Sequence, residues 1–129
     1  AVQICESMLK GKPANYDFWQ RNGSFTKDGR TTPTAIRLEG LLGALGFLPK
    51  EHSYLRRQII FAISAGLQFL LRSQITSGEH AGGIPRAIQN LPKDHPQWKR
   101  SFNRRATEVR IDYVQHALSA MLAYERMFY

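Results

Sequence analysis

Residues 32–49, TPTAIRLEGLLGALGFLP, decide the fold class of this 129-residue chain. The stretch opens on Thr32, a good helix cap, and on Pro33, which suits the first helical position because its missing N–H has no helical partner there. Leucines then recur at helical spacing until Pro49 ends the stretch. The pattern predicts an amphipathic helix that starts at Thr32 and ends before Pro49.

Two further stretches repeat this spacing and extend the prediction to an all-α domain. The first, from about Glu51 to Ser73, has apolar residues beyond a single stripe, which predicts a helix covered on more than one side. The second runs from about Ala106 to Met127, and a shorter helix is expected at 2–9. Strand signals are weak, because no hairpin dipeptide lies between alternating runs. We therefore predict an all-α chain of about four helices.

Composition excludes several classes of protein. The chain is 43% hydrophobic, so it can build one core, and neither disorder nor several domains is expected. Its single cysteine, Cys5, cannot form an internal disulfide or a cysteine-rich metal site. No apolar run approaches the ~18–20 residues of a membrane span, and no signal-peptide pattern is present, so the cytoplasm is the favoured location. We expect residues 1–129 to form one domain; its start at Ala1 is compatible with a terminal portion of a longer protein.

The charge balance favours anionic partners. Lys and Arg number 18 against 10 Asp and Glu, which gives a formal net charge of +8. This excess suits nucleic acid, acidic sugar, diphosphate or a membrane surface equally well, so charge alone does not select among them.

Two long polar loops, at about 11–31 and 75–105, separate predicted helices. By contrast, the helix that ends before Pro49 and the next one are joined by residues 49 and 50 alone. Loops of more than about 15 residues in a compact domain are uncommon and often functional. The order of helices places both long loops at one end of the domain, which we call the front end. Function is expected at the front end.

An internal repeat with an offset of 73 residues links the first and last long helices. Residues 34–39, TAIRLE, match residues 107–112, TEVRID, and 44–45 matches 117–118. The match predicts two repeated helical hairpins. Two hairpins are usually too few to close an array, so the missing neighbours are expected to be the remainder of a longer chain or a second subunit.

Each copy of the repeat carries an arginine and an acid two residues apart: Arg37 with Glu39, and Arg110 with Asp112. Side chains two apart on a helix point about 200° apart. Two interpretations stay open. The arginines clamp a loop carbonyl or a neighbouring carboxylate, or the arginines and acids of adjacent helix starts converge on an anionic ligand.

Residues 66–80, GLQFLLRSQITSGEH, resemble the repeat motif of terpenoid cyclases and prenyltransferases, which reads Gly, aromatic-Leu, Gln, Gly, Trp. Ala65 stands where that motif usually has a basic residue, and His80 stands in place of its tryptophan. A fainter copy is Gln20-x2-Gly23-Ser-Phe25. The resemblance implies an α/α toroid, in which the motif ends an outer helix and a loop leads into an inner helix.

Residues 82–86, GGIPR, resemble the Gly-Gly-aromatic-Pro turns of toroids that process polysaccharides, such as uronate epimerases and lyases, although isoleucine replaces the aromatic residue. Whole toroids of this kind have about five to seven hairpins and this chain has about two, so the resemblance implies a partial toroid. No mechanism transfers, because the Asp-rich motif of the cyclases and the zinc ligands of the protein prenyltransferases have no counterpart here.

Candidate proton-transfer groups lie at or near the front end, and glycoside chemistry needs an acid paired with a base or nucleophile. A histidine can supply either role near neutral pH. The candidates are Glu79, His80, Glu108 and Asp112. Each also has a plainer explanation, such as a solvated loop histidine or an acid at a helix start.

A second group of residues suits binding, because guanidinium groups hold anions and aromatic rings stack on sugars. The candidates are Arg37, Glu39, Arg86, Trp98, Arg110 and Tyr113. The aromatic candidates have plainer explanations too, because a tryptophan can anchor a long loop and a tyrosine can pack with its hydroxyl capped.

No metal or cofactor is expected. The four histidines lack ligand spacing, and neither a phosphate loop nor a dinucleotide fingerprint is present. The basic residues at 99–100 and 104–105, interleaved with Trp98 and Phe102, have the character of a nucleic-acid surface. Nucleic acid is nevertheless not the favoured partner, because no recognised nucleic-acid-binding fold is evident.

These observations give a leading hypothesis and two alternatives. The leading one is a carbohydrate-active toroid domain that binds an anionic saccharide, with its cleavage or epimerisation left open. The alternatives are a non-catalytic helical scaffold for protein interaction, and a toroid that processes prenyl or terpenoid substrates.

Overall fold

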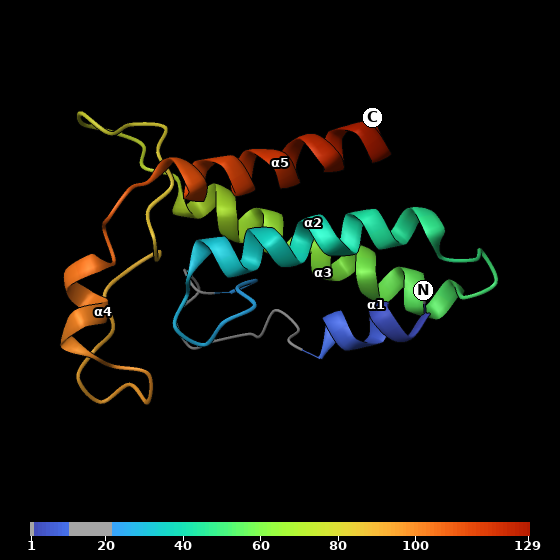
Figure 1. Cartoon of the computed structure of the whole chain (residues 1–129), viewed down its shortest axis with the longest axis horizontal. Coiled ribbons are helices and arrows are strands. Elements are labelled where there is room, and N and C mark those ends of the chain that lie inside the picture. Colours follow the sequence, from blue (N-terminus) through green and yellow to red (C-terminus); the bar gives the residue numbers. More distant parts are fainter. Residues whose placement is uncertain (1, 11–21) are drawn as a thin grey trace.

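The computed structural model describes residues 2–10 and 22–129. Within them the chain forms five helices and no strand: α1 (Val2–Leu9), α2 (Thr31–Phe47), α3 (Ser53–Ser73), α4 (Arg100–Arg105) and α5 (Ile111–Phe128) (Figure 1). The all-α prediction is confirmed. Gln20, the first residue of the fainter motif copy, lies outside the described residues.

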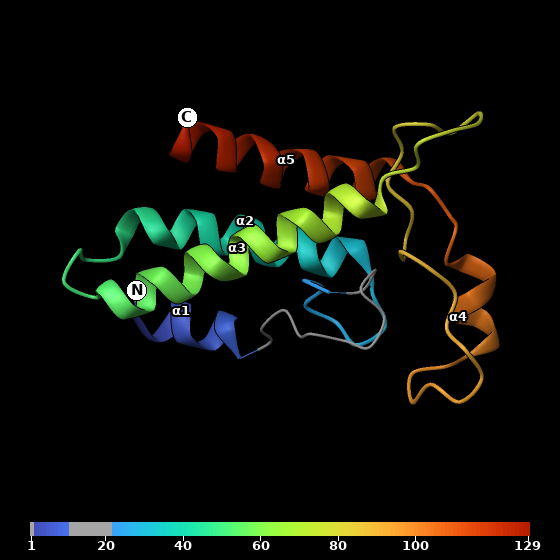
Figure 2. The same ribbon diagram turned by 180° about the vertical axis from the view of Figure 1, so that it is seen from behind.

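The four longer helices lie side by side, with α2 in contact with α1, α3 and α5. The views from the front and from behind show that α2 and α5 run in one direction and α1 and α3 in the opposite one (Figures 1 and 2). The short link at 48–52 requires α3 to turn back along α2. None of the described helices has the length and hydropathy needed to cross a membrane.

The core lies where α2 meets its three neighbours. The leucines of α2 that repeat at helical spacing, with Leu38 among them, are buried there. Gly66 of α3 allows a close approach, since a Cβ at this position would lie 2.7 Å from Cδ2 of Leu38. One glycine of the toroid-like motif therefore has a packing role. We expected α3 to be covered on more than one side. This expectation is confirmed at Phe69, which is buried, but is wrong at Phe61 and Leu71, which are exposed.

The last long helix begins later than expected. The sequence predicts a helix from about Ala106, whereas α4 ends at Arg105 and α5 starts at Ile111. Ala106 and Thr107 form a turn instead, and Val109 pairs with Pro85 in an isolated antiparallel bridge. Glu108 therefore lies in the link between the two helices and does not start a helix.

The internal repeat is not confirmed. Residues 34–39 lie inside α2, whereas residues 107–110 precede α5. The starts of the two helices, Thr31 and Ile111, are 80 residues apart, and the sequence match has an offset of 73. The matched arginines consequently occupy different positions relative to their helices.

Both long connections lie at the same end of the molecule within the described residues. The segments at 22–30 and 74–110 gather at the left of Figure 1, and the link at 48–52 lies at the opposite end. The predicted front end is thus confirmed for this part of the chain.

Candidate anion-binding site

Backbone hydrogen bonds join three distant segments at the front end. Thr31 N–H donates to the carbonyl of Arg86 at 3.0 Å, and Thr31 Oγ1 donates to the carbonyl of Pro85 at 2.6 Å. Arg86 N–H in turn donates to the carbonyl of Glu108 at 2.8 Å. Two isolated bridges, Arg30 with Ala87 and Pro85 with Val109, reinforce the arrangement. The start of α2, the long loop and the link before α5 are therefore held together.

These contacts create a cleft of about 360 Å³, which we call the basic cleft. Its volume falls within the range of small-ligand sites. Four cationic side chains and one carboxylate line it. The lining residues are Asp28, Arg30, Arg86, Gln97, Lys99, Ser101, Phe102 and Arg105.

Asp28 carries the single carboxylate of the basic cleft. The residue is 9% exposed, and its Oδ2 accepts a hydrogen bond from Arg30 Nε at 2.9 Å. Its Oδ1 is buried and has no partner in the described part of the chain. A buried carboxylate oxygen without a donor costs free energy. Asp28 therefore lines the basic cleft with Oδ2 bonded to Arg30 and with Oδ1 buried beneath the surface.

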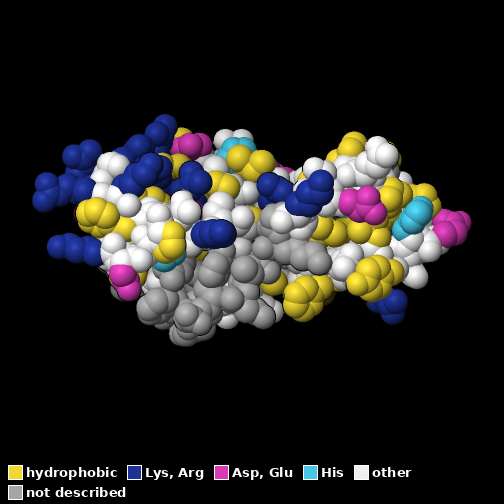
Figure 3. All heavy atoms as spheres, turned by 90° about the horizontal axis from the view of Figure 1, so that it is seen from below, with side chains coloured by type: hydrophobic (Ala, Val, Ile, Leu, Met, Phe, Trp, Pro, Cys, Tyr) yellow, Lys and Arg dark blue, Asp and Glu magenta, His cyan; other side chains and the backbone are white. Residues whose placement is uncertain are grey.

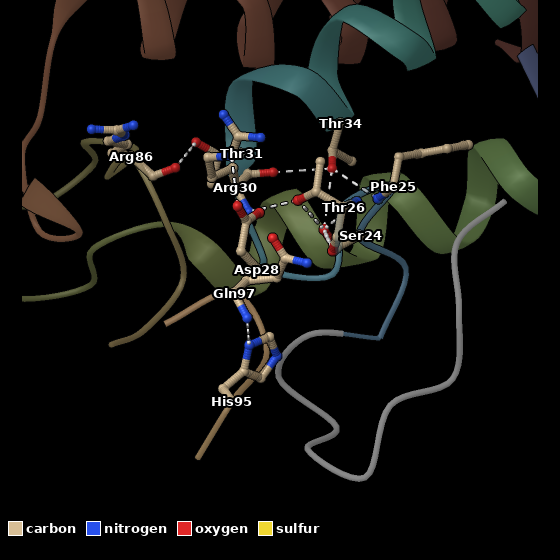
Figure 4. Close-up of polar contacts among 10 residues, drawn as sticks. All are labelled: Ser24, Phe25, Thr26, Asp28, Arg30, Thr31, Thr34, Arg86, His95 and Gln97. Carbon is tan, nitrogen blue, oxygen red and sulfur yellow. Dashed lines mark hydrogen bonds and ion pairs between the residues drawn. The ribbon is translucent and has the colours of Figure 1, made fainter. Parts of the chain in front are cut away.

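Side-chain hydrogen bonds hold the loop that presents Asp28. Phe25 N–H donates to Thr34 Oγ1 at 3.0 Å, and Arg30 N–H donates to Thr26 Oγ1 at 3.0 Å (Figure 4). Ser24 Oγ accepts from the backbone N–H of Thr26 at 3.1 Å. Short polar side chains commonly fix turns in this way. The loop before α2 is therefore ordered against the first turns of that helix.

A second small core supports the opposite wall. Phe102 of α4 is buried with Ala87, Leu91 and Ala106. Asn103 accepts from Leu91 N–H at 2.7 Å and donates to its carbonyl at 2.8 Å. α4 is consequently fixed to the long loop, and its residues Ser101 and Arg105 line the cleft together with Lys99, which precedes the helix.

An ion-pair network borders the cleft at Glu108. Arg105 donates to this carboxylate through Nε at 2.8 Å and through Nη2 at 3.2 Å, while Arg110 Nη1 lies 3.8 Å from Oε1. Tyr113 Oη donates to Oε1 at 3.4 Å. The Arg105 hydrogen bond is the main cause that lowers the pKa of Glu108, and it raises the pKa of Arg105. Asp112 Oδ1 lies 3.3 Å from Arg110 Nε, so it too is ion-paired.

The pair Arg37 and Glu39 holds helices together and does not line the basic cleft. Arg37 Nη1 donates to the carbonyl of Met8 at 2.7 Å, which ties α2 to α1. Glu39 Oε2 lies 3.1 Å from His116 Nδ1, which links α2 to α5. The clamp interpretation of Arg37 therefore agrees with its contacts, and Arg110 similarly contacts Glu108 and Asp112 at the start of α5.

The remaining predicted residues divide between the cleft and its surroundings. Arg86 lines the cleft, and Trp98 is half-buried against the small core beside it. Glu79 and His80 are exposed in the turn at 77–82 and do not line this cleft. Their suggested roles in proton transfer stay predictions.

Arg86 is the one lining residue of the basic cleft among the ten site candidates from the sequence, and the charged residues Asp28, Arg30 and Arg105 are among the seven that were missed. Arg105 belongs to the basic run that was visible in the sequence, so its signal was available. The grouping of Asp28 and Arg30 with Arg86 depends on backbone pairing across more than 50 residues, which no local pattern reveals. No group of three or more potential metal-ligating side chains comes together among residues 2–10 and 22–129.

No protein-family model, curated protein or solved structure matches this chain. The function therefore has to be inferred from the chemistry of the basic cleft.

Proposed function

We propose that this protein binds an anionic saccharide in the basic cleft. The observation that carries the proposal is the combination of four cationic side chains with the neutral polar side chains of Gln97 and Ser101 around a single cleft of about 360 Å³. The cations suit an acidic group on the ligand, and the neutral polar side chains suit hydroxyl groups beside it.

Two of the four cations are available to a ligand. Arg86 and Lys99 form no side-chain hydrogen bond or ion pair within the described residues, whereas Arg30 and Arg105 pair with Asp28 and Glu108. A guanidinium group binds a carboxylate or phosphate through two parallel hydrogen bonds. Arg86 is therefore the main proposed contact for the acidic group, with Lys99 as a second positive charge.

Asp28 makes a hydroxylated anion a better ligand than a bare one. A carboxylate or phosphate group can only accept hydrogen bonds from the cleft, and it would be repelled by Asp28. A sugar acid also carries hydroxyl groups, which add no negative charge beside Asp28. Gln97 and Ser101 supply further neutral donors and acceptors for hydroxyl groups.

The positive surface continues beyond the cleft along α4. Ser101 and Arg105 line the cleft, and Arg100 and Arg104 form the adjacent exposed row, because neighbours on a helix are turned by about 100°. Dark blue side chains gather at this end of the molecule (Figure 3). We therefore propose an acidic oligosaccharide as the ligand, one residue of which enters the cleft while its neighbours contact α4.

The proposal is restricted to binding. Glu108 and Asp112 are held in ion pairs, and the lowered pKa of Glu108 keeps it charged at neutral pH, which disfavours a role as general acid. A prenyl substrate is a weaker candidate, because Phe102 is the single aromatic residue in a predominantly charged lining. For the wider architecture we retain the partial toroid as a proposal, supported by α2 and α5 running opposite to α1 and α3.

Titration calorimetry with the 129-residue chain tests this function. Glucuronate is compared with cyclohexanecarboxylate, which has a ring and a carboxylate but no hydroxyl groups. We expect glucuronate to bind more tightly, because its hydroxyl groups can form hydrogen bonds with Gln97 and Ser101. We expect Gln97→Ala combined with Ser101→Ala to reduce the difference between the two ligands. Arg86→Ala should weaken glucuronate binding by about 10- to 100-fold, since a hydrogen bond to a charged group contributes about 1.5–3 kcal/mol. Arg57→Ala, an exposed arginine of α3 outside the basic cleft, is the matched control and should have no effect.

Ligand length provides a second test. Oligoglucuronates of increasing length should bind progressively more tightly, and Arg100→Ala with Arg104→Ala should remove that gain while leaving glucuronate binding unchanged. Absence of saturable glucuronate binding would reject the proposed function. Tighter binding of a short oligonucleotide than of an oligoglucuronate of equal charge would assign the surface to nucleic acid.

A further inference from the structure

Arg105 of the basic cleft keeps one edge of its guanidinium group free. The planar group carries N–H donors along two edges, and each edge can bind a carboxylate through two hydrogen bonds. Glu108 occupies the edge made by Nε and Nη2, at 2.8 and 3.2 Å. The other edge, made by Nη1 and Nη2, has no partner within the described residues. Arg105 can therefore hold Glu108 and a ligand at the same time.

Glu108 orients Arg105 without filling the cleft. It does not itself line the cleft, and its carboxylate has two further contacts on the side of α5. Arg110 Nη1 lies 3.8 Å from Oε1, and Tyr113 Oη donates to the same oxygen at 3.4 Å. The Arg105 guanidinium is thus held before a ligand binds, which reduces the conformational entropy that binding costs.

The basic cleft has two positive charges that no carboxylate compensates. Asp28 and Glu108 each pair with one lining arginine. Arg86 and Lys99 remain, and neither side chain has a partner within the described residues. The surplus charge of the cleft is therefore +2. A ligand with a single acidic group would neutralise only half of it.

The positive groups of the cleft belong to two separate parts of the fold. Arg86 lies in the long loop, where its carbonyl accepts the hydrogen bond from Thr31 N–H at the start of α2. Lys99 directly precedes α4, and Arg105 is the last residue of that helix. Lys99 and α4 contribute no carboxylate to the lining. This part of the cleft therefore suits an acidic group of its own, in addition to the one at Arg86.

We propose that the sugar unit that enters the basic cleft carries two carboxylate groups. Arg86 binds one of them, and the free edge of Arg105, together with Lys99, binds the other. This inference rests on the proposed function and narrows its ligand to a sugar diacid. The two carboxylates neutralise the surplus charge, and the hydroxyl groups between them suit the neutral side chains of Gln97 and Ser101.

Titration calorimetry of the 129-residue chain with glucarate and gluconate tests the inference. The two ligands share a hydroxylated carbon chain and differ in that glucarate has a carboxylate at both ends. We expect glucarate to bind about 10- to 100-fold more tightly, which is the gain from hydrogen bonds to a charged group.

Variants of the α4 side assign this gain to its source. Arg105→Ala combined with Glu108→Ala leaves the net charge of the chain unchanged, and it should reduce the ratio of the two affinities about tenfold through loss of the free edge. Lys99→Ala, at an exposed position, should also reduce the ratio and does not disturb the Arg105–Glu108 pair. Arg57→Ala is the matched control and should leave the ratio unchanged. Circular dichroism checks that each variant is folded.

Glucuronate, measured in parallel, separates this inference from the proposed function. Equal affinities for glucarate and gluconate, with saturable binding of glucuronate, would overturn the diacid inference and leave the proposed function standing. A ratio that is unchanged in the folded Arg105→Ala, Glu108→Ala variant would also overturn it, because the second carboxylate would then bind elsewhere. Absence of binding by all three ligands would reject the proposed function and this inference together.

Discussion

Glu108 shows that the type of a residue does not fix its protonation behaviour, which depends on the groups that contact it. The sequence marks it as an acid at the front end and hence as a candidate for proton transfer. Its actual state depends on Arg105, which donates two hydrogen bonds to its carboxylate and is the principal reason for its lowered pKa. The pair forms because the chain turns after α4, where Glu108 N–H donates to the carbonyl of Arg105 at 3.0 Å and the two residues come together.

We predict that Arg105→Ala raises the pKa of Glu108 toward its ordinary value, because the donor that stabilises the charged form is removed. Since the pKa is lower in the folded chain than in the unfolded chain, the pair stabilises the fold fully above the unfolded pKa. That contribution is lost as the pH falls through the folded pKa. A carbon-detected NMR titration of the glutamate carboxyl groups measures the shift.

The matched control is Arg104→Ala, since Arg104 precedes Arg105 on α4 and forms no ion pair with Glu108. The Glu108 titration in this variant should remain that of the parent. An unchanged titration in Arg105→Ala would show that the hydrogen bond does not control the charge of Glu108.

At the scale of the element, α2 shows where sequence periodicity is reliable. Its leucines recur on one side, and the structure buries that side against α1, α3 and α5. The same approach misplaces the start of α5, because residues 107–110 fit the helical pattern, whereas Glu108 and Val109 pair with the long loop. A local pattern can predict a helix. It cannot show whether the backbone of the expected first turn forms hydrogen bonds with a distant segment instead.

Two substitutions on α2 separate burial from helix propensity. Leu38→Ala should destabilise the fold by about 2–5 kcal/mol, because it removes a fully buried side chain and leaves a cavity beside Gly66. Ile36→Ala, two residues earlier on the exposed side of the same helix, should change stability by less than about 0.5 kcal/mol. Urea denaturation measures both, and equal losses would contradict the burial assigned to α2.

At the scale of the whole molecule, the basic cleft depends on contacts between segments that are far apart in the sequence. Thr31 is the clearest example: its buried hydroxyl donates to the carbonyl of Pro85, and its backbone N–H donates to the carbonyl of Arg86. These bonds place Arg86 opposite α4, on the other side of the cleft that it lines with Lys99 and Arg105.

We predict that Thr31→Val destabilises the fold by about 1–3 kcal/mol, since it removes the hydroxyl donor of a buried carbonyl. It should also weaken binding of glucuronate, because Arg86 is held through the same segment. Thr32→Val is the control: the Thr32 hydroxyl is buried without a partner in the described part of the chain, so its removal should be neutral or stabilising. Thermal unfolding and calorimetry measure the two effects. Equal behaviour of the two variants would contradict the role of the Thr31 hydroxyl.

Spacing and composition were enough to predict the helical class, most helix bounds and the excess of positive charge, because these signals act over one or two turns of chain. They also indicated that both long loops gather at one end. Which charges meet depends on the fold: Arg37 and Glu39 tie helices together, whereas Arg30, Arg86 and Arg105 surround one cleft. Backbone pairing between residues 24 and 57 positions apart fixes the neighbours in the cleft, and this long-range pairing leaves no periodic pattern in the sequence.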